Sequence, residues 1–381
     1  MTQLLTYFDA FAARHKPYKG GAWCYEDGLV YAGLLALHDA TGEARWIDHA
    51  ERMIAGQIGA DGTLSGYERD EFNIDNILPG RAVLGLYKKT QTPIYLAAAE
   101  VLADQLRDHP KTKSGNYWHK KRYPWQIWLD GLYMGLPFQA EYGLVTGKDD
   151  LVENALSQMK QGLEVTFVER TGLYAHAIDE SRKQLWADPQ SGQNAAHWSR
   201  AIGWLVMALV DLREMVGAER FDAAGLTAPT HALLTRLAQL QGQSGFWQQV
   251  TDEPDLARNY DESSASAMFA YGFLKAVRLG LWSSPQEGEA ALDALVTCMM
   301  DGSRAAQGVG FGGICWVAGL GDYNGRFRDG TAGYYVREDI VEDDPKGVAP
   351  LMAATAEAIR AGHPLAQPGA SYVAPKTRSY G

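Results

Sequence analysis

The chain alternates between two kinds of apolar segment. The first kind is rich in small residues and apolar almost all round. The second kind is amphipathic, with apolar residues at positions i, i+3, i+4 and i+7, and this spacing predicts a helix with one buried face. The first kind occupies 27–42, 79–91, 130–147, 200–217, 263–280 and 346–362, and the second occupies 2–15, 44–58, 93–106, 149–163, 229–240 and 289–302.

These segments predict twelve helices in six pairs, which is a repeat of organisation rather than of sequence. The small-residue helices would form an inner ring, aligned at Gly28, Gly80, Gly131, Gly203, Ala265 and Gly347, and the amphipathic helices an outer ring. We therefore expect an all-α protein with an (α/α)6 barrel of six helical hairpins. An open α-solenoid is the alternative, which the unequal repeat lengths disfavour.

One domain is expected to span residues 1–365. Residues 366–381 contain turn formers without periodicity, and we expect a C-terminal tail that is partly disordered.

Five loops rich in aromatic residues and glycine each join an outer helix to the next inner helix. They would gather at one end of the barrel, where we expect short β-hairpins and the active site. These loops are 61–67, 115–123, 172–186, 245–254 and 308–316.

Composition narrows the class of protein. The net charge of −11 argues against a nucleic-acid partner, and the apolar runs are shorter than a membrane span. The N-terminus lacks the apolar region of a signal peptide, so we expect a cytoplasmic protein, either a monomer or a small homo-oligomer. Three distant cysteines and scattered histidines predict neither a disulfide framework nor a metal, and no cofactor is expected.

Aromatic residues are abundant, with 11 Trp and 19 Tyr among 381 residues. A large aromatic core would account for them, but a carbohydrate site is the sharper interpretation, because a Trp face stacks on a sugar ring. The segment Gly308–Gly313, "GVGFGG", matches a dinucleotide motif but lacks its flanking strand and helix, so we expect a turn-rich loop.

Several motifs together resemble one enzyme family. "WHKKRYPWQIWLDGLYMG", "HAIDESRKQLWADPQSG" and "HWSRAIGW" resemble glycoside hydrolase family 105, the unsaturated rhamnogalacturonyl hydrolases. "WCYEDGLVYAGL", "DNILPGR", "DESSASAMFAYG" and "EDDPKGVAP" follow in the family's order, so the resemblance covers about Trp23 to Ala354. The segment Gly330–Asp339 and His197 depart from the family pattern. Family 88, the unsaturated glucuronyl hydrolases, fits these motifs less closely.

The resemblance implies the (α/α)6 barrel fold and a hydrolysis that begins with hydration of a double bond. Such an enzyme hydrates the C4=C5 double bond of a terminal 4,5-unsaturated galacturonic acid and releases the adjacent rhamnose from small pectin-derived oligosaccharides. The alternatives are an unsaturated glucuronyl hydrolase for another polysaccharide, a non-catalytic sugar-binding barrel, and an isomerase or epimerase that relies on paired histidines.

Asp130 is the candidate acid. Its aromatic and apolar neighbours in sequence favour the protonated carboxyl that the first step requires. Gly131 and Gly135 follow it, although each costs about 1 kcal/mol in a helix relative to Ala, so the segment is not built for stability alone. The alternative is an N-cap on a helix that begins at Gly131.

The other catalytic candidates are Asp75, His119 and His176. The resemblance makes Asp75 a charge stabiliser or a partner that positions the water, with helix capping as the rival interpretation. Either histidine can bind the water or the sugar hydroxyls, although a lone histidine is more often structural.

Arg200 is the expected partner of the substrate carboxylate, which a guanidinium binds with two hydrogen bonds, and Lys120 would assist. Their alternative is an ordinary ion pair with Asp179 or Glu180. Trp198 is expected to face the cleft, whereas Trp204 fits the core and the cleft equally well. Weaker candidates for the pocket wall, with core packing as the default, are Tyr25, Trp128 and Met134.

Overall fold

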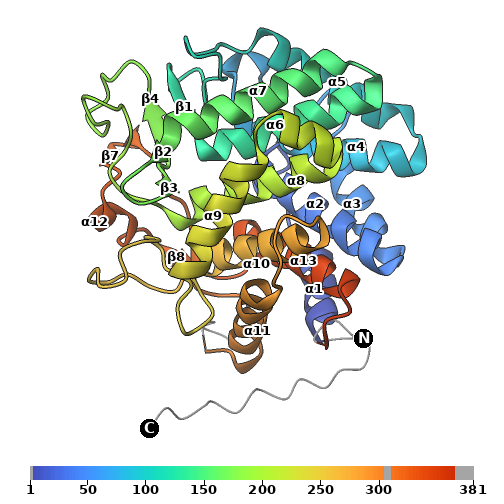
Figure 1. The fold of residues 1–381 in the computed structure, drawn as a ribbon. Helices are drawn as coiled ribbons and strands as arrows, with labels where there is room; N and C mark the ends of the chain where they lie inside the picture. The colour runs from blue at the N-terminus through green and yellow to red at the C-terminus, as the bar shows by residue number, and fades with distance from the viewer. Residues whose placement is uncertain (1–2, 304–309, 365–381) are drawn as a thin grey trace.

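Two concentric rings of helices make up the computed structural model, which describes residues 3–303 and 310–364 (Figure 1). The inner ring consists of α2 (Tyr25–Thr41), α4 (Pro79–Thr90), α6 (Leu129–Thr146), α8 (Ser199–Ala223), α10 (Ser263–Arg278) and α13 (Pro345–Arg360). The outer helices are α1 (Gln3–Arg14), α3 (Arg45–Ile54), α5 (Pro93–Asp108), α7 (Asp149–Thr166), α9 (Thr227–Leu240) and α11 (Gln286–Asp301).

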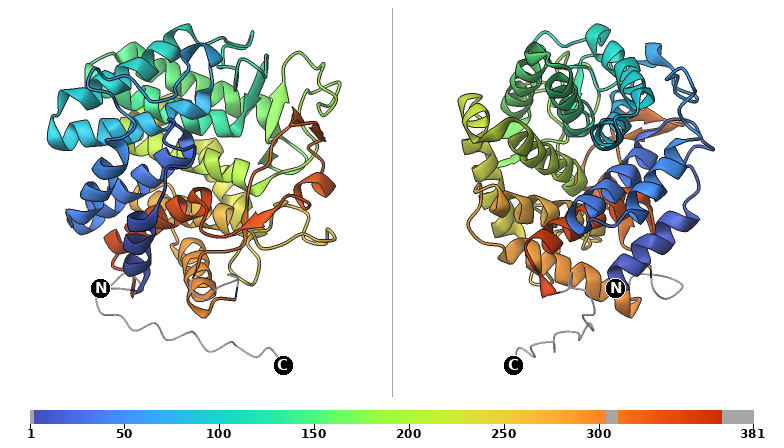
Figure 2. Two further views of the ribbon diagram at one scale, coloured as in Figure 1. Left: turned by 180° about the vertical axis from the view of Figure 1, so that it is seen from behind. Right: turned by 90° about the vertical axis from the view of Figure 1, so that its right-hand side faces the viewer.

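The inner ring is closed. Each inner helix packs against the next one, and α13 packs against α2, so the last pair meets the first. The right-hand view of Figure 2 shows this ring nearly end-on, with the outer helices around it. The closure confirms the (α/α)6 barrel predicted from the sequence, and it excludes the open solenoid.

Glycines let the inner helices approach each other closely. A Cβ atom on Gly28 would lie 2.5 Å from Cγ of Pro79, at the start of the neighbouring inner helix. A Cβ atom on Gly80 would lie 2.5 Å from the ring of Phe138 on α6. No real Cβ atom tolerates such contacts, so the small residues aligned in the sequence are positions of close packing between helices.

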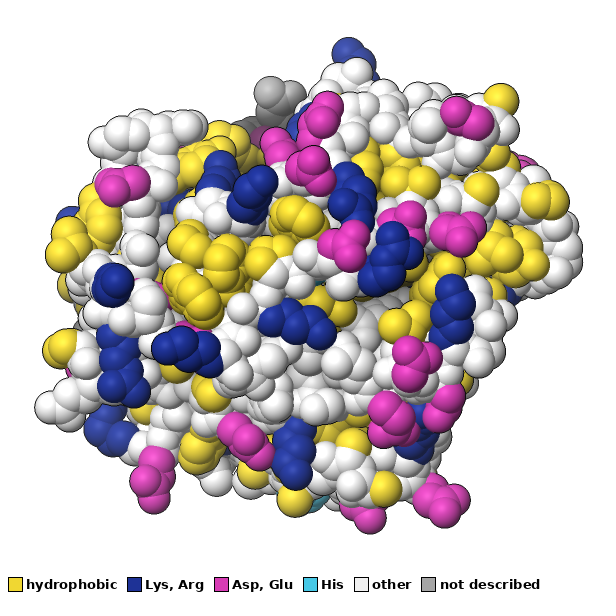
Figure 3. Space-filling view, turned by 90° about the horizontal axis from the view of Figure 1, so that it is seen from above, with side chains coloured by type: hydrophobic (Ala, Val, Ile, Leu, Met, Phe, Trp, Pro, Cys, Tyr) yellow, Lys and Arg dark blue, Asp and Glu magenta, His cyan; other side chains and the backbone are white. Residues whose placement is uncertain are grey.

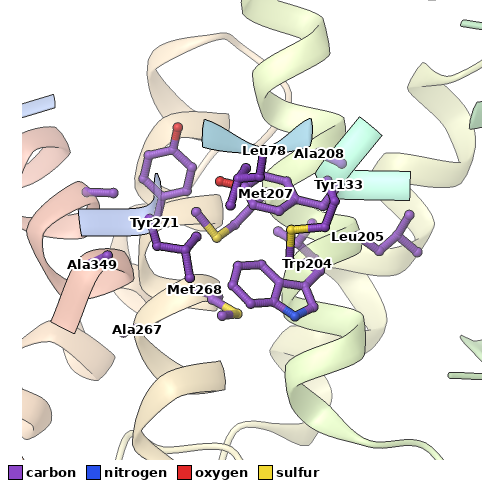
Figure 4. Close-up of a cluster of buried hydrophobic side chains, with 14 of the residues drawn as sticks. Leu78, Tyr133, Trp204, Leu205, Met207, Ala208, Ala267, Met268, Tyr271 and Ala349 are labelled. Atoms are coloured by element: carbon purple, nitrogen blue, oxygen red, sulfur yellow. The ribbon is translucent and has the colours of Figure 1, made fainter. Parts of the chain in front are cut away.

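The barrel interior is filled with apolar side chains (Figure 4). Trp204 on α8 stacks on Tyr133 of α6, with ring centroids 5.0 Å apart and ring planes 15° apart. Its side chain is only 1% exposed, and Met268 of α10 lies beside it. Of the two interpretations of Trp204, the structure supports the core.

Short antiparallel strand pairs gather at one end of the barrel, on the left of Figure 1. They lie in the loops that lead from an outer helix to the next inner helix, where hairpins were predicted. The pairs are β1 (Gln126–Trp128) with β4 (Ala177–Asp179), β2 (Phe167–Val168) with β3 (Leu173–Tyr174), β5 (Ile314–Cys315) with β8 (Ile340–Val341), and β6 (Gly321–Tyr323) with β7 (Arg326–Arg328).

Several boundaries differ from the prediction. Helix α8 continues to Ala223, beyond a break at Gly217, whose φ of 81° is left-handed. A short helix, α12 (Ala332–Tyr335), and two 3-10 turns, η1 (Arg69–Glu71) and η2 (Ile74–Ile77), were not predicted. The predicted tail 366–381 and the first two residues of "GVGFGG" lie outside the described residues.

A cavity of about 400 Å³ opens at the barrel end opposite the strands. Asp211 of α8 is buried there, and its carboxylate lies 2.7 Å from both Arg81 of α4 and Lys275 of α10. The hydroxyl of Tyr271 also donates to it. This network joins three inner helices.

On the face shown in Figure 3, basic and acidic side chains are interspersed with hydrophobic ones. That face therefore lacks the continuous basic surface of a nucleic-acid binder. Within the described ranges, every helix is too short or too polar to cross a bilayer.

Candidate active site

A cavity of about 1020 Å³ lies at the strand end of the barrel. This volume is at the upper end of ligand pockets, which span about 300–1,000 Å³, so it has room for more than one sugar ring. Seven of the residues predicted for the site line it: Tyr25, Asp75, His119, Lys120, Trp128, Asp130 and Met134.

Asp130 lies in the first turn of α6, directly after strand β1. This strand pairs with β4, and the N–H of Leu129 donates to the carbonyl of His176, so the pairing brings Asp130 beside His176. The Oδ2 atom of Asp130 lies 3.1 Å from Nε2 of His176. In the described part of the chain, neither of these buried atoms has a regular hydrogen-bond partner.

The capping interpretation of Asp130 is wrong. Helix α6 begins at Leu129, the N-cap position is Trp128, and the cap has no side-chain hydrogen bond. The carboxyl group of Asp130 is therefore not engaged by the helix terminus. It is left at the cavity wall with a histidine as its neighbour.

The ring of His176 is fully buried and held on several sides. Its Nδ1 atom lies 2.8 Å from the hydroxyl of Tyr335 on α12. The indole of Trp128 meets it edge-on at 5.1 Å, and Trp198 lies on another side at 5.0 Å. These contacts fix the imidazole relative to Asp130.

Asp75 sits in the 3-10 turn η2, directly before the inner helix α4. The side chain of Asn73 caps this turn by accepting the N–H of Asp75, and the N-cap of α4 is Leu78, without a side-chain bond, so the capping interpretation of Asp75 is also wrong. The Nζ atom of Lys120 lies 2.5 Å from Oδ2 of Asp75, and Nε2 of His119 lies 3.7 Å from Oδ1. Burial opposes ionisation, but the Lys120 ammonium, with His119 and Lys19 adding to its effect, outweighs burial and lowers the pKa of Asp75.

His119 is held in a stack of aromatic rings. Its ring lies 4.4 Å from that of Trp128 at an angle of 9°, and Tyr123 extends the stack. Burial lowers the pKa of His119 to about 3, although Asp75 opposes the shift. His119 is therefore neutral at physiological pH, and its Nδ1 atom lacks a hydrogen-bond partner among the described residues.

Arg200 and Trp198 lie behind the cavity wall. The guanidinium of Arg200 donates to the backbone carbonyls of Cys315 and Trp316 and lies over the ring of Trp198. Arg200 is 1% exposed, and its Nε has no hydrogen-bond partner in the described chain. Burial and Glu26 raise the pKa of Tyr25, a residue that lines the cavity. The Arg200 guanidinium is close enough to Tyr25 to offset part of that rise.

The predicted alternative partners of the cations are engaged elsewhere. Asp179 accepts backbone N–H groups of its own loop, and Glu180 accepts those of Lys113 and Ser114. His197, which departs from the family pattern, binds Thr171 and the carbonyl of Tyr174, and so it holds loops together.

Sequence reasoning missed Tyr335 and Asn194, which support His176 from behind. It also missed side chains at the cavity mouth, where Trp316 donates to the hydroxyl of Tyr18 and Arg328 donates to that of Tyr123. The one available signal was that Tyr335 belongs to the segment Gly330–Asp339, which departs from the family pattern. Among the described residues, no three His, Cys, Asp or Glu side chains lie together in a way that could hold a metal ion.

The chain is similar to known glycoside hydrolases. Residues 9–362 match the model of Glycosyl Hydrolase Family 88. A solved family 105 glycoside hydrolase of C. acetobutylicum ATCC 824 is 34% identical, with a TM-score of 0.87 over 94% of this chain and 99% of that one.

Two curated proteins are also similar. Protein Atu3128 of Agrobacterium fabrum is 47% identical over 59% of this chain and 98% of its own length. The unsaturated rhamnogalacturonyl hydrolase YesR of Bacillus subtilis is 26% identical over 72% of this chain and 76% of its own. The chain therefore belongs to Glycosyl Hydrolase Family 88, and its full-length similarity to a family 105 structure confirms the resemblance seen in its motifs.

Proposed function

We propose that this glycoside hydrolase hydrates the C4=C5 double bond of a 4,5-unsaturated galacturonic acid at the non-reducing end of a small rhamnogalacturonan fragment. The observation that carries the proposal is the carboxyl group of Asp130. It lines the cavity, makes no capping bond, and faces His176 at 3.1 Å. The similarity to YesR supports galacturonyl-rhamnose as the substrate.

The reaction balances with one water molecule. The Asp130 carboxyl gives its proton to C4, and the electrons of the double bond form the new C4–H bond. Water adds at C5 and returns a proton to the Asp130 carboxylate. The C5 hemiketal opens to a ketone and leaves a hemiacetal at C1, which releases rhamnose as the free alcohol.

The carboxyl groups of Asp75 and Asp130 lie in different surroundings, so we assign them different roles. Asp75 is paired with the Lys120 ammonium and stays ionised, so it suits the stabilisation of positive charge at C5 or the positioning of water. Asp130 has no lysine or arginine within ion-pair distance among the described residues, and the ionisable side chain beside it there is His176. Asp130 is accordingly the proton donor.

The cavity also suits an anionic sugar. The inner helices begin at this end, so their positive dipole ends face the substrate carboxylate. Lys120 and the unpaired Nε of Arg200 are the proposed partners of that carboxylate. His119 would bind the water or a hydroxyl, while Tyr25, Trp128 and Met134 would pack against the ring. Trp198 contributes indirectly, by holding His176 and Arg200.

The test follows the ultraviolet absorbance of the conjugated double bond. Wild type, Asp130→Asn and the control Asp48→Asn, an exposed acid on the outer helix α3, are mixed with unsaturated galacturonyl-rhamnose. Wild type and the control should bleach the band, whereas Asp130→Asn should be slower by about 10²–10⁴-fold. Equal rates in Asp130→Asn would remove Asp130 from its role.

The same assay separates the rival substrates. Faster bleaching of an unsaturated glucuronyl disaccharide would favour the glucuronyl alternative over the galacturonyl one. Binding without bleaching of any unsaturated sugar would point to a barrel that has lost its chemistry.

A further inference from the structure

We propose that Tyr335 is a positioning residue that holds His176 in the tautomer with its proton on Nε2 and thereby directs the acidic proton of Asp130 to Oδ1. The catalytic consequence rests on the proposed function, whereas the tautomer itself does not. A chain of contacts leads from Asn194 through Tyr335 and His176 to Asp130.

The orientation of the Asn194 amide is fixed by its neighbours. Its Oδ1 accepts the backbone N–H of Ala177 at 3.0 Å, and its Nδ2 donates to the carbonyl of Ala196 at 2.8 Å. The amide nitrogen therefore faces the hydroxyl of Tyr335, 3.4 Å away, as a donor. The hydroxyl oxygen accepts this bond, and its own proton must point elsewhere.

The Tyr335 proton has one acceptor within reach in the described chain, which is Nδ1 of His176 at 2.8 Å. Burial keeps the phenol neutral, because it raises the pKa of Tyr335 well above its usual value, with Tyr334 and Asp130 adding to the shift. A neutral imidazole that accepts at Nδ1 carries its proton on Nε2.

The ring of Tyr335 cannot turn away easily. It is fully buried and stacks on Trp198, with centroids 5.9 Å apart and planes 10° apart. Its backbone carbonyl accepts a hydrogen bond from Gln249. The hydroxyl is thus held at His176 by packing from one side and by the α12 backbone from the other.

Nε2 is then the protonated nitrogen of His176 and lies 3.1 Å from Oδ2 of Asp130, although the two atoms do not form a regular hydrogen bond in the structure. A proton on Oδ2 would lie against this N–H group, so the proton that Asp130 gives to the substrate resides on Oδ1. Since Oδ2 is buried, Oδ1 is the oxygen left to face the cavity. After proton transfer, the same N–H stabilises the carboxylate.

Tyr335→Phe removes the hydroxyl and keeps the stacked ring. The matched control is Tyr334→Phe, because Tyr334 lies on the same helix and its hydroxyl accepts the N–H of Gly319. We expect kcat of Tyr335→Phe to fall by about 10- to 100-fold, as is typical when a partner that orients a histidine is lost, with KM unchanged. Tyr334→Phe should match wild type.

The tautomer is read directly by ¹H–¹⁵N correlation spectra of histidine-labelled protein without substrate. The spectra are taken at about pH 8, above the ordinary histidine pKa of about 6.5, and His176→Gln assigns the signal. Wild type and Tyr334→Phe should show Nε2–H, and Tyr335→Phe should show a mixture or Nδ1–H.

An Nδ1–H tautomer in wild type, or an unchanged tautomer and kcat in Tyr335→Phe, would overturn the inference. Failure of the proposed function would instead show as a wild-type enzyme that turns over no unsaturated sugar, and the spectra would still decide the tautomer.

Discussion

The ammonium of Lys120 lies 2.5 Å from the Asp75 carboxylate, inside a cavity where burial alone would favour the neutral acid. The two side chains come from loops that precede different inner helices, and a single bridge between Asn73 and Lys120 aligns them. The charge of Asp75 therefore depends on a cation from the next hairpin.

Lys120→Met should move the acid limb of the pH profile. Loss of the ammonium leaves burial as the main influence, so the pKa of Asp75 rises. If catalysis needs ionised Asp75, kcat/KM falls as the pH drops through that pKa, and the limb of the variant lies at higher pH than that of wild type. Lys121→Met is the control, since the Lys121 ammonium donates to the backbone carbonyl of Asp70. Coincident acid limbs in wild type and Lys120→Met would contradict this role.

Arg200→Lys should raise KM by about 10- to 100-fold, since a hydrogen bond to a charged group contributes about 1.5–3 kcal/mol. The shorter cation would lose the contact that Nε is proposed to make with the substrate, and also the bonds to the Cys315 and Trp316 carbonyls. Arg213→Lys is the control, because Arg213 lies on the same helix and donates to the carbonyl of Leu279. A lower melting temperature with unchanged KM would assign Arg200 to the loop alone.

Asp211→Asn should destabilise the fold by about 3–5 kcal/mol at neutral pH, because it removes the buried carboxylate that Arg81 and Lys275 share and leaves only their pairs with Glu141 and Glu214. Urea unfolding measures this loss. Glu153→Gln, at an exposed pair with Arg220, should cost about 1 kcal/mol or less. Equal losses in the two variants would refute the importance of the buried network.

Wild type and Asp211→Asn can also be compared as the pH is lowered, which tests the charge of Asp211. Although burial opposes the shift, Lys275 and Arg81 lower the pKa of Asp211 to about 2, below the value of about 3.9 in an unfolded chain. A depressed pKa adds stability that is complete above about pH 4 and is lost as the pH falls toward 2. The stability gap between wild type and Asp211→Asn should therefore narrow below about pH 4, and a constant gap would argue against this linkage.

Gly28→Ala should lower stability by about 1–3 kcal/mol, although alanine favours a helix by about 1 kcal/mol. The added Cβ would lie 2.5–2.7 Å from three atoms of Pro79, whose rigid ring cannot move aside. Thermal unfolding checks this. Gly56→Ala, where the added atom meets nothing within 4 Å, is the control and should keep the wild-type midpoint.

The barrel could be predicted from the sequence because helices and their contacts leave local patterns in it. Apolar spacing identified the helices, and the aligned small residues, such as Gly28 and Gly80, marked where neighbouring helices touch. The boundaries of α8 were missed because the chain resumes its helix after Gly217, where a glycine normally ends one. The cytoplasmic location and the oligomeric state stay predictions.

The site could be predicted only in part, because some of its contacts join residues that are far apart in the sequence. Asp75 and Asp130 stood out because their motifs are contiguous and resemble a family. Tyr335 did not, because it meets His176 across 159 positions of sequence, and no periodicity records a contact of that kind. The burial of Arg200 likewise depends on the distant loop of Cys315.

The contact between His176 and Tyr335, 159 positions apart in sequence, sets the order in which the proposed site is completed during synthesis. Asp130 leaves the ribosome about 200 residues before Tyr335, on the order of ten seconds or more at usual translation rates. Until then the nascent chain holds the proposed acid and its histidine without the hydroxyl that we propose orients this histidine. Catalytic competence is thus a late product of translation, and truncation before α12 would leave a helical fragment unable to complete its site.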